Sequence, residues 1–420
     1  MSENIILGEG CCYSSDSSIT QLNNNILVIG ASGSGKTMSI TEPRLLETKE
    51  SSLIVNLSKQ KLAEKYMPLY RARGYNNIHV INFANPSLSQ SGYDPIRYLH
   101  NDTDIREFAE SIIMSDPRKE QSHADPYWDH GSTSLLTAEI AAIKETKRNP
   151  SFTDVLDLHN QLEIIDGTGG LIQTSLDEFF ERISTKNPKS IASSCWRSFR
   201  MLPIKTASCV FSSLNVMLDA IFPPDMWTLM KKNNQVDIRR IGVERSIIFL
   251  ISSPVNTGLH QFENLFFDQV IKELFSFAEE CVDGTLPVPV IIQCDDFACG
   301  SKLRNFPEFI SVIREKGISV VLIIQSESQL ISMYGTDDAT TIRNNCDTII
   351  FLGSLDLHTC KTMSEYTNRP LEDILYMDIG TEIILRRGQR PIFTKRYPIL
   401  EDKRYFTGTE SYENCNELPT

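Results

Sequence analysis

The stretch Gly30-Ala31-Ser32-Gly33-Ser34-Gly35-Lys36-Thr37 decides the fold of this 420-residue chain. Its spacing, a glycine, four residues and then Gly-Lys-Thr, is typical of a phosphate-binding loop, whose glycines let successive backbone amides point at phosphate oxygens. The apolar residues 26–29 before the loop predict a β-strand, and residues 36–40 after it predict the start of a helix whose positive end faces the same site. Pro43 is expected to kink that helix or to end its first stretch, because proline lacks an amide donor.

These residues predict a nucleotide site that takes ATP with Mg²⁺. The backbone cradle is expected to consist of Gly30, Ser32, Gly33, Ser34 and Gly35. Lys36 would reach the β- and γ-phosphates, and Thr37 would hold the Mg²⁺ ion. The alternative, a chance glycine-rich turn, is disfavoured by the strand before the loop and the helix after it, because the motif demands that context.

A hydrolase of this kind needs a second strand that ends in an acid in contact with the metal ion. Residues 289–294 form an apolar run that ends directly in Asp295 and Asp296. We expect Asp295 to serve the metal ion and Asp296 to orient or deprotonate the attacking water. The alternative is a turn with two solvated acids, which is common after strands.

Two further residues are candidates on weaker local signals. Gln325 follows the apolar run 320–324, and a glutamine in that place could sense the γ-phosphate or position water. A polar residue at the end of a strand is, however, equally ordinary. Arg314 precedes the same run, and the local sequence does not distinguish a functional arginine there from a solvated one.

Composition bounds the class of protein. The chain is 41% hydrophobic and 23% charged, as a soluble globular protein is, and its formal net charge of -13 excludes nucleic-acid binding through the overall field. Any contact with DNA must therefore use a local basic lining. The pairs 231–232, 239–240, 386–387 and 395–396 are either such a lining or solvated surface. The ten cysteines are scattered without zinc-ligand spacing, which predicts free thiols in a reducing cytosol.

Targeting signals are not expected. The N-terminal residues have no basic start followed by an apolar stretch, which a secretory signal requires. No apolar run approaches the roughly 20 residues that a bilayer span needs. We therefore expect a cytoplasmic protein that is at most peripheral at the inner face of the cell membrane, through partners.

The order of the predicted elements indicates an α/β fold with a mainly parallel sheet, interrupted by an inserted all-α domain. Apolar β-type runs occur at residues 26–29, 53–55, 78–81, 246–251, 288–294, 318–324, 348–352 and 382–385. Helical patterns occur at residues 59–73, 132–144, 171–183 and 206–221. We therefore divide the chain into the first part of a nucleotide-binding domain (1–96), an all-α insert (97–227), the second part of the nucleotide-binding domain (228–400) and a loose acidic tail (401–420).

Together these residues resemble the type IV coupling proteins of bacterial conjugation, the TraG/TraD-like P-loop ATPases, over most of the chain. After the phosphate loop, Pro43-Arg44-Leu45-Leu46 is similar to the proline-containing helix of that family. Asp295-Asp296-Phe297-Ala298 and the stretches 314–318 and 325–330 are similar to three consecutive family motifs. No single piece beyond the loop is specific, but the ordered set is.

The resemblance implies a RecA-like motor with a helical domain, assembled as a homo-hexamer at the cytoplasmic mouth of a secretion channel. The implied partners are single-stranded DNA with its bound relaxase, and components of the type IV secretion channel. Arg314 is implied as a finger that reaches the γ-phosphate of the neighbouring subunit, and Gln325 as the sensor of that phosphate.

Three departures from the family pattern bear on activity. Asp296 stands where the family usually has glutamate, which sets its carboxylate back by on the order of 1.5 Å, and catalysis is sensitive to such misplacement. The stretch 56–60 reads Asn-Leu-Ser-Lys-Gln where the family often has Asp-Pro-Lys-Gly-Glu. The membrane helices typical of the family are not recognised, so a separate membrane-anchoring subunit is a possible partner.

Two functions remain open from the sequence, and a third is disfavoured. The first is an ATP-driven coupling protein that translocates DNA, and the second is a nucleotide-binding adaptor of the same fold that recruits substrates with little or no hydrolysis. The acid pair is the feature that separates them. A DNA-translocating ATPase of chromosome segregation or filamentous phage assembly is disfavoured by the long helical insert.

Overall fold

A nine-stranded sheet forms the centre of the structure, a computed structural model that describes residues 3–115, 126–167, 172–252, 257–297, 302–303 and 305–407. The strand order is β13-β12-β11-β3-β10-β9-β4-β8-β5. The strands are β3 (Ile26–Ile29), β4 (Ser52–Leu57), β5 (Asn77–Asn82), β8 (Ser246–Ile251), β9 (Val290–Cys294), β10 (Ile318–Ile324), β11 (Thr348–Phe351), β12 (Thr381–Arg386) and β13 (Ile392–Lys395). All neighbouring strands from β11 to β5 are parallel, whereas β12 is antiparallel to both β11 and β13.

The sheet is mainly parallel because its central strands are apolar on both faces. In β3 and β10, side chains alternate between two separate hydrophobic clusters: Leu27 and Leu322 lie in one, Val28 and Val321 in the other. Strands buried on both faces form continuous apolar runs, which is the pattern that predicts them in the sequence. The expected mainly parallel α/β fold is therefore confirmed.

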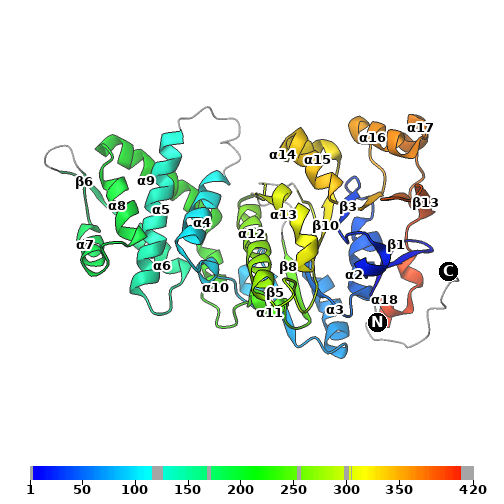
Figure 1. Ribbon diagram of the computed structural model, residues 1–420, viewed down its shortest axis with the longest axis horizontal. Helices are drawn as coiled ribbons and strands as arrows, with labels where there is room; N and C mark the ends of the chain where they lie inside the picture. The colour runs from blue at the N-terminus through cyan, green and yellow to red at the C-terminus, as the bar shows by residue number, and fades with distance from the viewer. Residues whose placement is uncertain are drawn as a thin grey trace.

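Two layers cover the sheet, as Figure 1 shows. One face packs against α2 (Glu42–Glu47), α3 (Gln60–Ala72) and the hairpin of β1 (Asn4–Gly8) and β2 (Cys11–Ser14). The other face packs against α12 (Thr257–Glu280), α13 (Phe306–Val312), α14 (Glu327–Tyr334), α15 (Thr336–Asn344), α16 (Leu357–Thr367) and α17 (Leu371–Leu375). Shorter helices connect these layers: α1 (Ser17–Thr20), η2 (Pro86–Leu88), α11 (Ile238–Ile241) and η7 (Ile313–Lys316).

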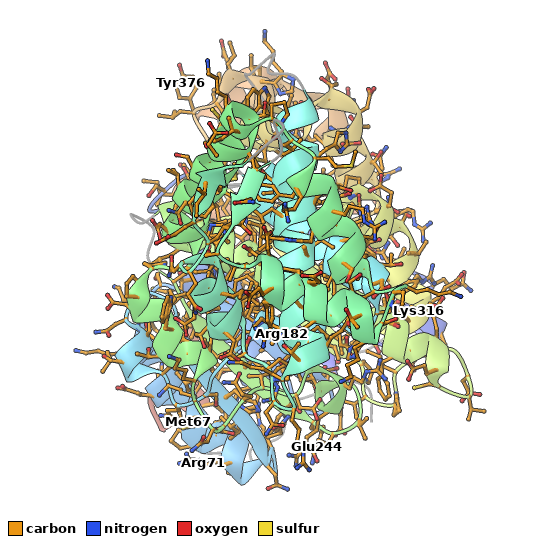
Figure 2. The ribbon with its side chains drawn as sticks, turned by 90° about the vertical axis from the view of Figure 1, so that its left-hand side faces the viewer. Met67, Arg71, Arg182, Glu244, Lys316 and Tyr376 are labelled. Atoms are coloured by element: carbon orange, nitrogen blue, oxygen red, sulfur yellow. The ribbon has the colours of Figure 1, made fainter. Side chains whose placement is uncertain are left out.

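A helical unit lies at the end of the molecule opposite to the two termini (Figure 1). Its elements are η3 (Pro95–Tyr98), α4 (Asp102–Met114), α5 (Pro126–Thr146), α6 (Phe152–His159), α7 (Asp177–Lys186), α8 (Ile191–Arg200), α9 (Ile204–Ile221), η6 (Pro224–Met226) and α10 (Trp227–Met230). The helices expected at 132–144 and 206–221 are confirmed as parts of α5 and α9. Seen from this end, Arg182 of α7 lies centrally on the outer surface (Figure 2).

The expectation that this unit is purely helical is wrong in one place. Strands β6 (Ile164–Asp166) and β7 (Ile172–Thr174) form a short antiparallel pair, and the helix expected from residue 171 begins only at Asp177. Ile172 and Thr174 are buried while Gln173 between them is exposed, so the local period is two rather than 3.6. Leu171, where that helix was expected to begin, lies outside the described residues.

Helix α9 is, within the described ranges, the single helix that is long and apolar enough to cross a bilayer by length and composition. Core helices of soluble proteins pass the same test. Here α9 packs against α5, with Val210, Leu214 and Leu218 buried in the helical unit. These three side chains therefore take part in the core of that unit.

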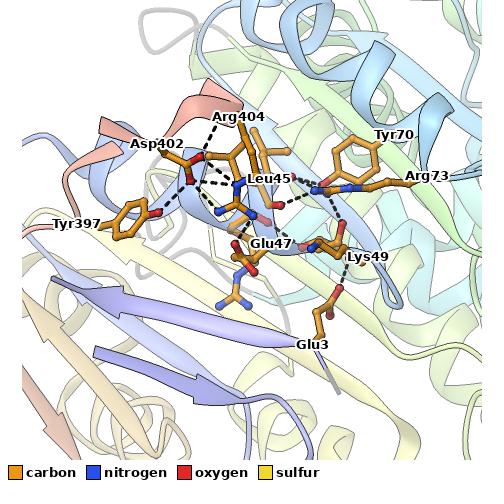
Figure 3. Close-up of polar contacts among 12 residues, drawn as sticks. Glu3, Leu45, Glu47, Lys49, Tyr70, Arg73, Tyr397, Asp402 and Arg404 are labelled. Atoms are coloured by element: carbon orange, nitrogen blue, oxygen red, sulfur yellow. Dashed lines mark hydrogen bonds and ion pairs between the residues drawn. The ribbon is translucent and has the colours of Figure 1, made fainter. Parts of the chain in front are cut away.

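The C-terminal segment returns to the helix that follows the phosphate loop. After β13, η8 (Ile399–Glu401) and α18 (Lys403–Thr407) pack near α2, as Figure 3 shows. Arg404 forms ion pairs with Glu47 of α2 at 2.6 Å and with Asp402 at 2.7 Å, and the Tyr397 hydroxyl donates to Asp402 at 2.9 Å. The expectation of a loose tail from residue 401 therefore does not hold for residues 401–407, and residues 408–420 lie outside the described part.

Candidate nucleotide-binding site

The phosphate loop connects β3 to the helix η1 (Thr37–Thr41) at the carboxyl edge of the sheet. Strands β10 and β11 flank β3, and both hold the loop by backbone contacts. The Gly30 amide donates to the Ile324 carbonyl at 3.1 Å, and the Ala31 amide donates to the Gly353 carbonyl at 3.1 Å. The loop is thus fixed at its base by the strands on either side.

Three positions of the loop require glycine. Gly33 and Gly35 adopt φ angles of 76° and 78°, in the left-handed region that side chains disfavour. A β-carbon on Gly30 would lie 2.5 Å from the Ser34 hydroxyl oxygen and 3.0 Å from the β-carbon of Leu352. Ser32 and Gly33 are exposed at the tip of the loop. The loop has the geometry that the motif predicts.

Lys36 and Thr37 begin the helix behind the loop. The Lys36 ammonium donates to the Gly30 carbonyl at 2.8 Å and lies 3.4 Å from the Ala31 carbonyl, so it folds back over the loop. Helix η1 is a π-type turn that ends at Thr41, and α2 follows with Pro43 in its first turn, where a missing amide costs no hydrogen bond. The first helical stretch therefore ends before Pro43, as its position predicts.

The acid pair lies at the same edge, directly after β9. One strand, β10, separates β9 from the loop strand β3. Asp296 adopts φ 51°, and its amide donates to the Asp295 carboxylate at 3.1 Å. The Gln325 side-chain amide lies 3.4 Å from the Asp296 carboxylate. The structure thus brings together Asp296 and Gln325, which lie in separate motifs of the sequence.

The charges at this edge are coupled. Burial and the neighbouring charge of Asp296 raise the pKa of Asp295 to about 6, and the ammonium of Lys36 opposes that rise. The two adjacent carboxylates are hard oxygen donors, which is the ligand class that Mg²⁺ prefers. No cluster of three or more acidic, histidine or cysteine side chains suited to a metal occurs among the described residues.

A third acid, Glu263 of α12, lies behind the pair and was not predicted from the sequence. It is 4% exposed and accepts a hydrogen bond from Asn56, whose own oxygen accepts from Ser252 at 2.8 Å. Burial, together with the charge of Asp295, raises the pKa of Glu263 to about 8. One signal in the sequence could have pointed to this part of the site, because Asn56 opens the stretch that departs from the family pattern. Glu263 itself lies in an apolar helix and belongs to no motif.

Arg314 does not join this group. It is exposed on η7 at the amino end of β10, whereas Gln325 follows the carboxyl end of the same strand. A seven-residue strand is about 20 Å long. Figure 2 shows the two edges of the molecule, with Tyr376 at the carboxyl edge and Glu244 at the amino edge. Arg314 borders a cavity of about 480 Å³ at the amino edge, together with Glu3 and Arg44.

Two of the four basic pairs, 239–240 and 386–387, are engaged in ion pairs with acids of the same chain. Arg239 contacts Glu273 and Glu280, Arg240 contacts Glu244, and Arg387 contacts Asp347. These contacts favour the solvated-surface interpretation for the residues concerned.

A phosphate loop on a central strand, an acid pair one strand away and a glutamine on the strand between them define the fold of a RecA-like P-loop NTPase. The sequence matches the family of type IV secretory system conjugative DNA transfer proteins over residues 4–369. This chain belongs to that family, and the predicted resemblance is confirmed.

Solved structures support the same fold. The bacterial conjugative coupling protein TrwBdeltaN70, in a trigonal form with sulphate, has a TM-score of 0.65 and 18% identity, covering 89% of this chain and 85% of that chain. TrwB with a non-hydrolysable ATP analogue has a TM-score of 0.63 and 18% identity, covering 89% and 84%. VirB4 of Thermoanaerobacter pseudethanolicus has a TM-score of 0.57 and 13% identity, covering 94% and 96%. A search of curated proteins finds no significant match.

Proposed function

We propose that this chain is an ATP-driven coupling protein that recruits conjugative single-stranded DNA with its bound relaxase and translocates it to a type IV secretion channel. The observation that carries the proposal is the meeting of Lys36, Asp295, Asp296 and Gln325 at one edge of the sheet in a member of the conjugative transfer family. TrwB has been solved with an ATP analogue and with ADP and Mg²⁺, which supports ATP and Mg²⁺ as the ligands here.

The side chains have separate tasks in hydrolysis. Lys36 leaves the carbonyl of Gly30 and binds phosphate oxygens, which the loop amides also cradle. Thr37 and Asp295 would hold Mg²⁺, which neutralises charge on the phosphates when it is bound. Asp296 accepts the proton of the attacking water, and Gln325, 3.4 Å from its carboxylate, orients that water.

Arg314 acts in the neighbouring subunit. It lies at the amino edge and the loop at the carboxyl edge, so it cannot reach the nucleotide of its own chain. A head-to-tail ring joins unlike surfaces of successive subunits, so it can bring the amino edge of one chain to the carboxyl edge of the next. We propose such a ring of six, with Arg314 beside the γ-phosphate of the neighbouring subunit.

A second candidate function rests on the acid pair. Asp296 is one methylene shorter than the glutamate usual in the family, and Asn56 replaces an acid nearby. These features favour slow hydrolysis. If hydrolysis is so slow that it is absent, the protein is a nucleotide-binding adaptor that recruits substrates without turnover. The test is an ATPase assay with and without single-stranded DNA. Stimulation by DNA supports translocation, whereas tight ATP binding with no turnover at any DNA concentration refutes it and supports the adaptor.

The proposed location is the cytoplasm, with docking at the inner face of the membrane through protein contacts, including contacts with a separate anchoring subunit. The net charge of -13 disfavours direct binding to anionic lipid. The test is fractionation of cells that express the chain with and without the other transfer proteins. Recovery in a salt-washed membrane pellet without partners would contradict the proposal, and pelleting only with partners would support docking.

A further inference from the structure

Arg396 lies at the nucleotide edge of the sheet although it is far from the loop in sequence. It follows β13, and its amide donates to the Gly380 carbonyl at 2.9 Å. Because β12 is antiparallel to both β11 and β13, β13 runs in the same direction as β3. The carboxyl end of β13 therefore lies at the edge where the phosphate loop begins.

The guanidinium of Arg396 reaches the loop itself. Its Nη2 donates to the Leu352 carbonyl at 3.0 Å, and Leu352 follows β11. Its Nη1 lies 3.0 Å from the point that a β-carbon on Gly35 would occupy. Gly35 is the residue directly before Lys36. The guanidinium of Arg396 therefore contacts the loop next to the position from which the lysine extends.

One donor of this arginine is not satisfied by the protein around it. Its Nε atom is buried and has no hydrogen-bond partner among the described residues. A buried donor without an acceptor is costly, and burial lowers the pKa of Arg396 against the attraction of Glu382. An arginine that lies beside a phosphate-binding loop with an unsatisfied N–H donor can donate a hydrogen bond to a bound anion.

Glu382 is the acid that interacts electrostatically with this guanidinium, and burial raises the pKa of Glu382 to about 8 against the attraction of Arg396. It pairs with Thr394 across the hairpin, so it lies on the same face as Arg396, two residues beyond Thr394. Glu382 is 1% exposed, and neither of its carboxylate oxygens has a hydrogen-bond partner among the described residues. A β-carbon on Gly8 of the covering hairpin would lie 2.2 Å from one of those oxygens. The acid is therefore enclosed, and it makes no hydrogen bond that would occupy a donor of Arg396.

We propose that Arg396 binds the α,β-diphosphate of the nucleotide held by its own chain, as a second cation beside Lys36. Gly35 lies at the helix end of the loop, and the backbone amides of such a loop cradle the α- and β-phosphates. The inference rests on the nucleotide site of the proposed function and assigns it a residue that acts in cis, in contrast to Arg314. Because the contact is to the diphosphate, it serves ADP and ATP alike.

The test is equilibrium titration of the full chain with ADP and with an ATP analogue, each with Mg²⁺. Arg396→Gln is expected to weaken both by about tenfold, since it removes charge-assisted hydrogen bonds. The matched control is Lys395→Gln, which removes the same charge from the adjacent, exposed residue and should bind as the wild type does. Wild-type affinity for ADP in a folded Arg396→Gln variant overturns the inference, as does a loss confined to the ATP analogue.

Melting curves separate binding from a structural role. The expected result for Arg396→Gln is an unchanged melting temperature without nucleotide and a smaller rise on adding ADP. If the single variant does not fold, the double variant Arg396→Gln with Glu382→Gln is used in the titration instead. It removes the arginine and the buried acid together. The double variant must then bind ADP about tenfold more weakly, and wild-type affinity or failure to fold overturns the inference. DNA-stimulated hydrolysis by the wild type is measured separately. It tests the proposed function independently of whether the Arg396 variants bind ADP more weakly.

Discussion

Lengthening Asp296 by one methylene is expected to accelerate hydrolysis. Asp296→Glu moves the carboxylate forward by on the order of 1.5 Å, and a misplacement of about 1 Å costs a reaction roughly 100-fold, or about 2.7 kcal/mol of barrier. The residue has φ 51°, where aspartate is tolerated better than glutamate, so the substitution adds about 1 kcal/mol of backbone strain. That strain is present before and during the reaction. Because the strain is the same in the ground state and in the transition state, it lowers the free energy of unfolding but leaves most of the expected gain in turnover.

The assay is single-stranded-DNA-stimulated ATP turnover at saturating ATP. The wild type is expected to be slow, and Asp296→Glu about tenfold to 100-fold faster. Asp296→Asn keeps the shape and the left-handed backbone but cannot take a proton, so its turnover should fall below that of the wild type. Equal or lower turnover in Asp296→Glu, with nucleotide affinity intact, would refute the geometric argument.

Three other outcomes are expected. Lys36→Ala should weaken binding of a fluorescent ATP analogue at least about tenfold, and unchanged affinity would contradict the role of the loop. Rings mixed from Arg314→Ala and Lys36→Ala subunits should recover part of the activity that each lacks alone, because intact pairs form again at some interfaces; no recovery in demonstrably mixed rings would count against action in trans. Burial raises the pKa of Glu263 to about 8, so the folded state keeps a proton that the unfolded chain loses near pH 4.3. Stability in EDTA without nucleotide should therefore fall as pH rises between those values, by at most about 1.4 kcal/mol per pH unit from this group. Glu263→Gln should flatten that fall, and an unaltered slope in urea unfolding would show that Glu263 is not its source.

The sheet could be predicted from the sequence because its strands are buried on both faces. Ile318–Ile324 reads as a continuous apolar run, and such runs stand out without any tertiary information. The phosphate loop was predictable for a different reason: all its chemistry lies in eight consecutive residues. The meeting of the acid pair with Gln325 was predictable because Asp295 and Gln325 each directly follow such a strand, and parallel strands end at one edge.

The rest depended on contacts that no local pattern encodes. Glu263 meets Asn56 across more than two hundred positions, and only the fold makes them neighbours. Arg396 was visible as one of several basic pairs, but its approach to Gly35 depends on the direction of the β12–β13 hairpin. The strands β6 and β7 are three residues each, too short for alternation to be distinguished from a helical pattern.

The neighbours of β3 have a consequence for how the protein is made. Among the strands that the structure describes, residues 26–29 pair with β10 and β11, which begin at Ile318 and Thr348. At about 5–20 residues per second, a ribosome needs on the order of 15 to 60 seconds to reach the first of them. During that time the four apolar residues have no strand to join, although the helical unit is already complete by Met230. The nascent chain therefore carries the strand of its phosphate loop unpaired through most of translation, which makes it a candidate client of ribosome-associated chaperones.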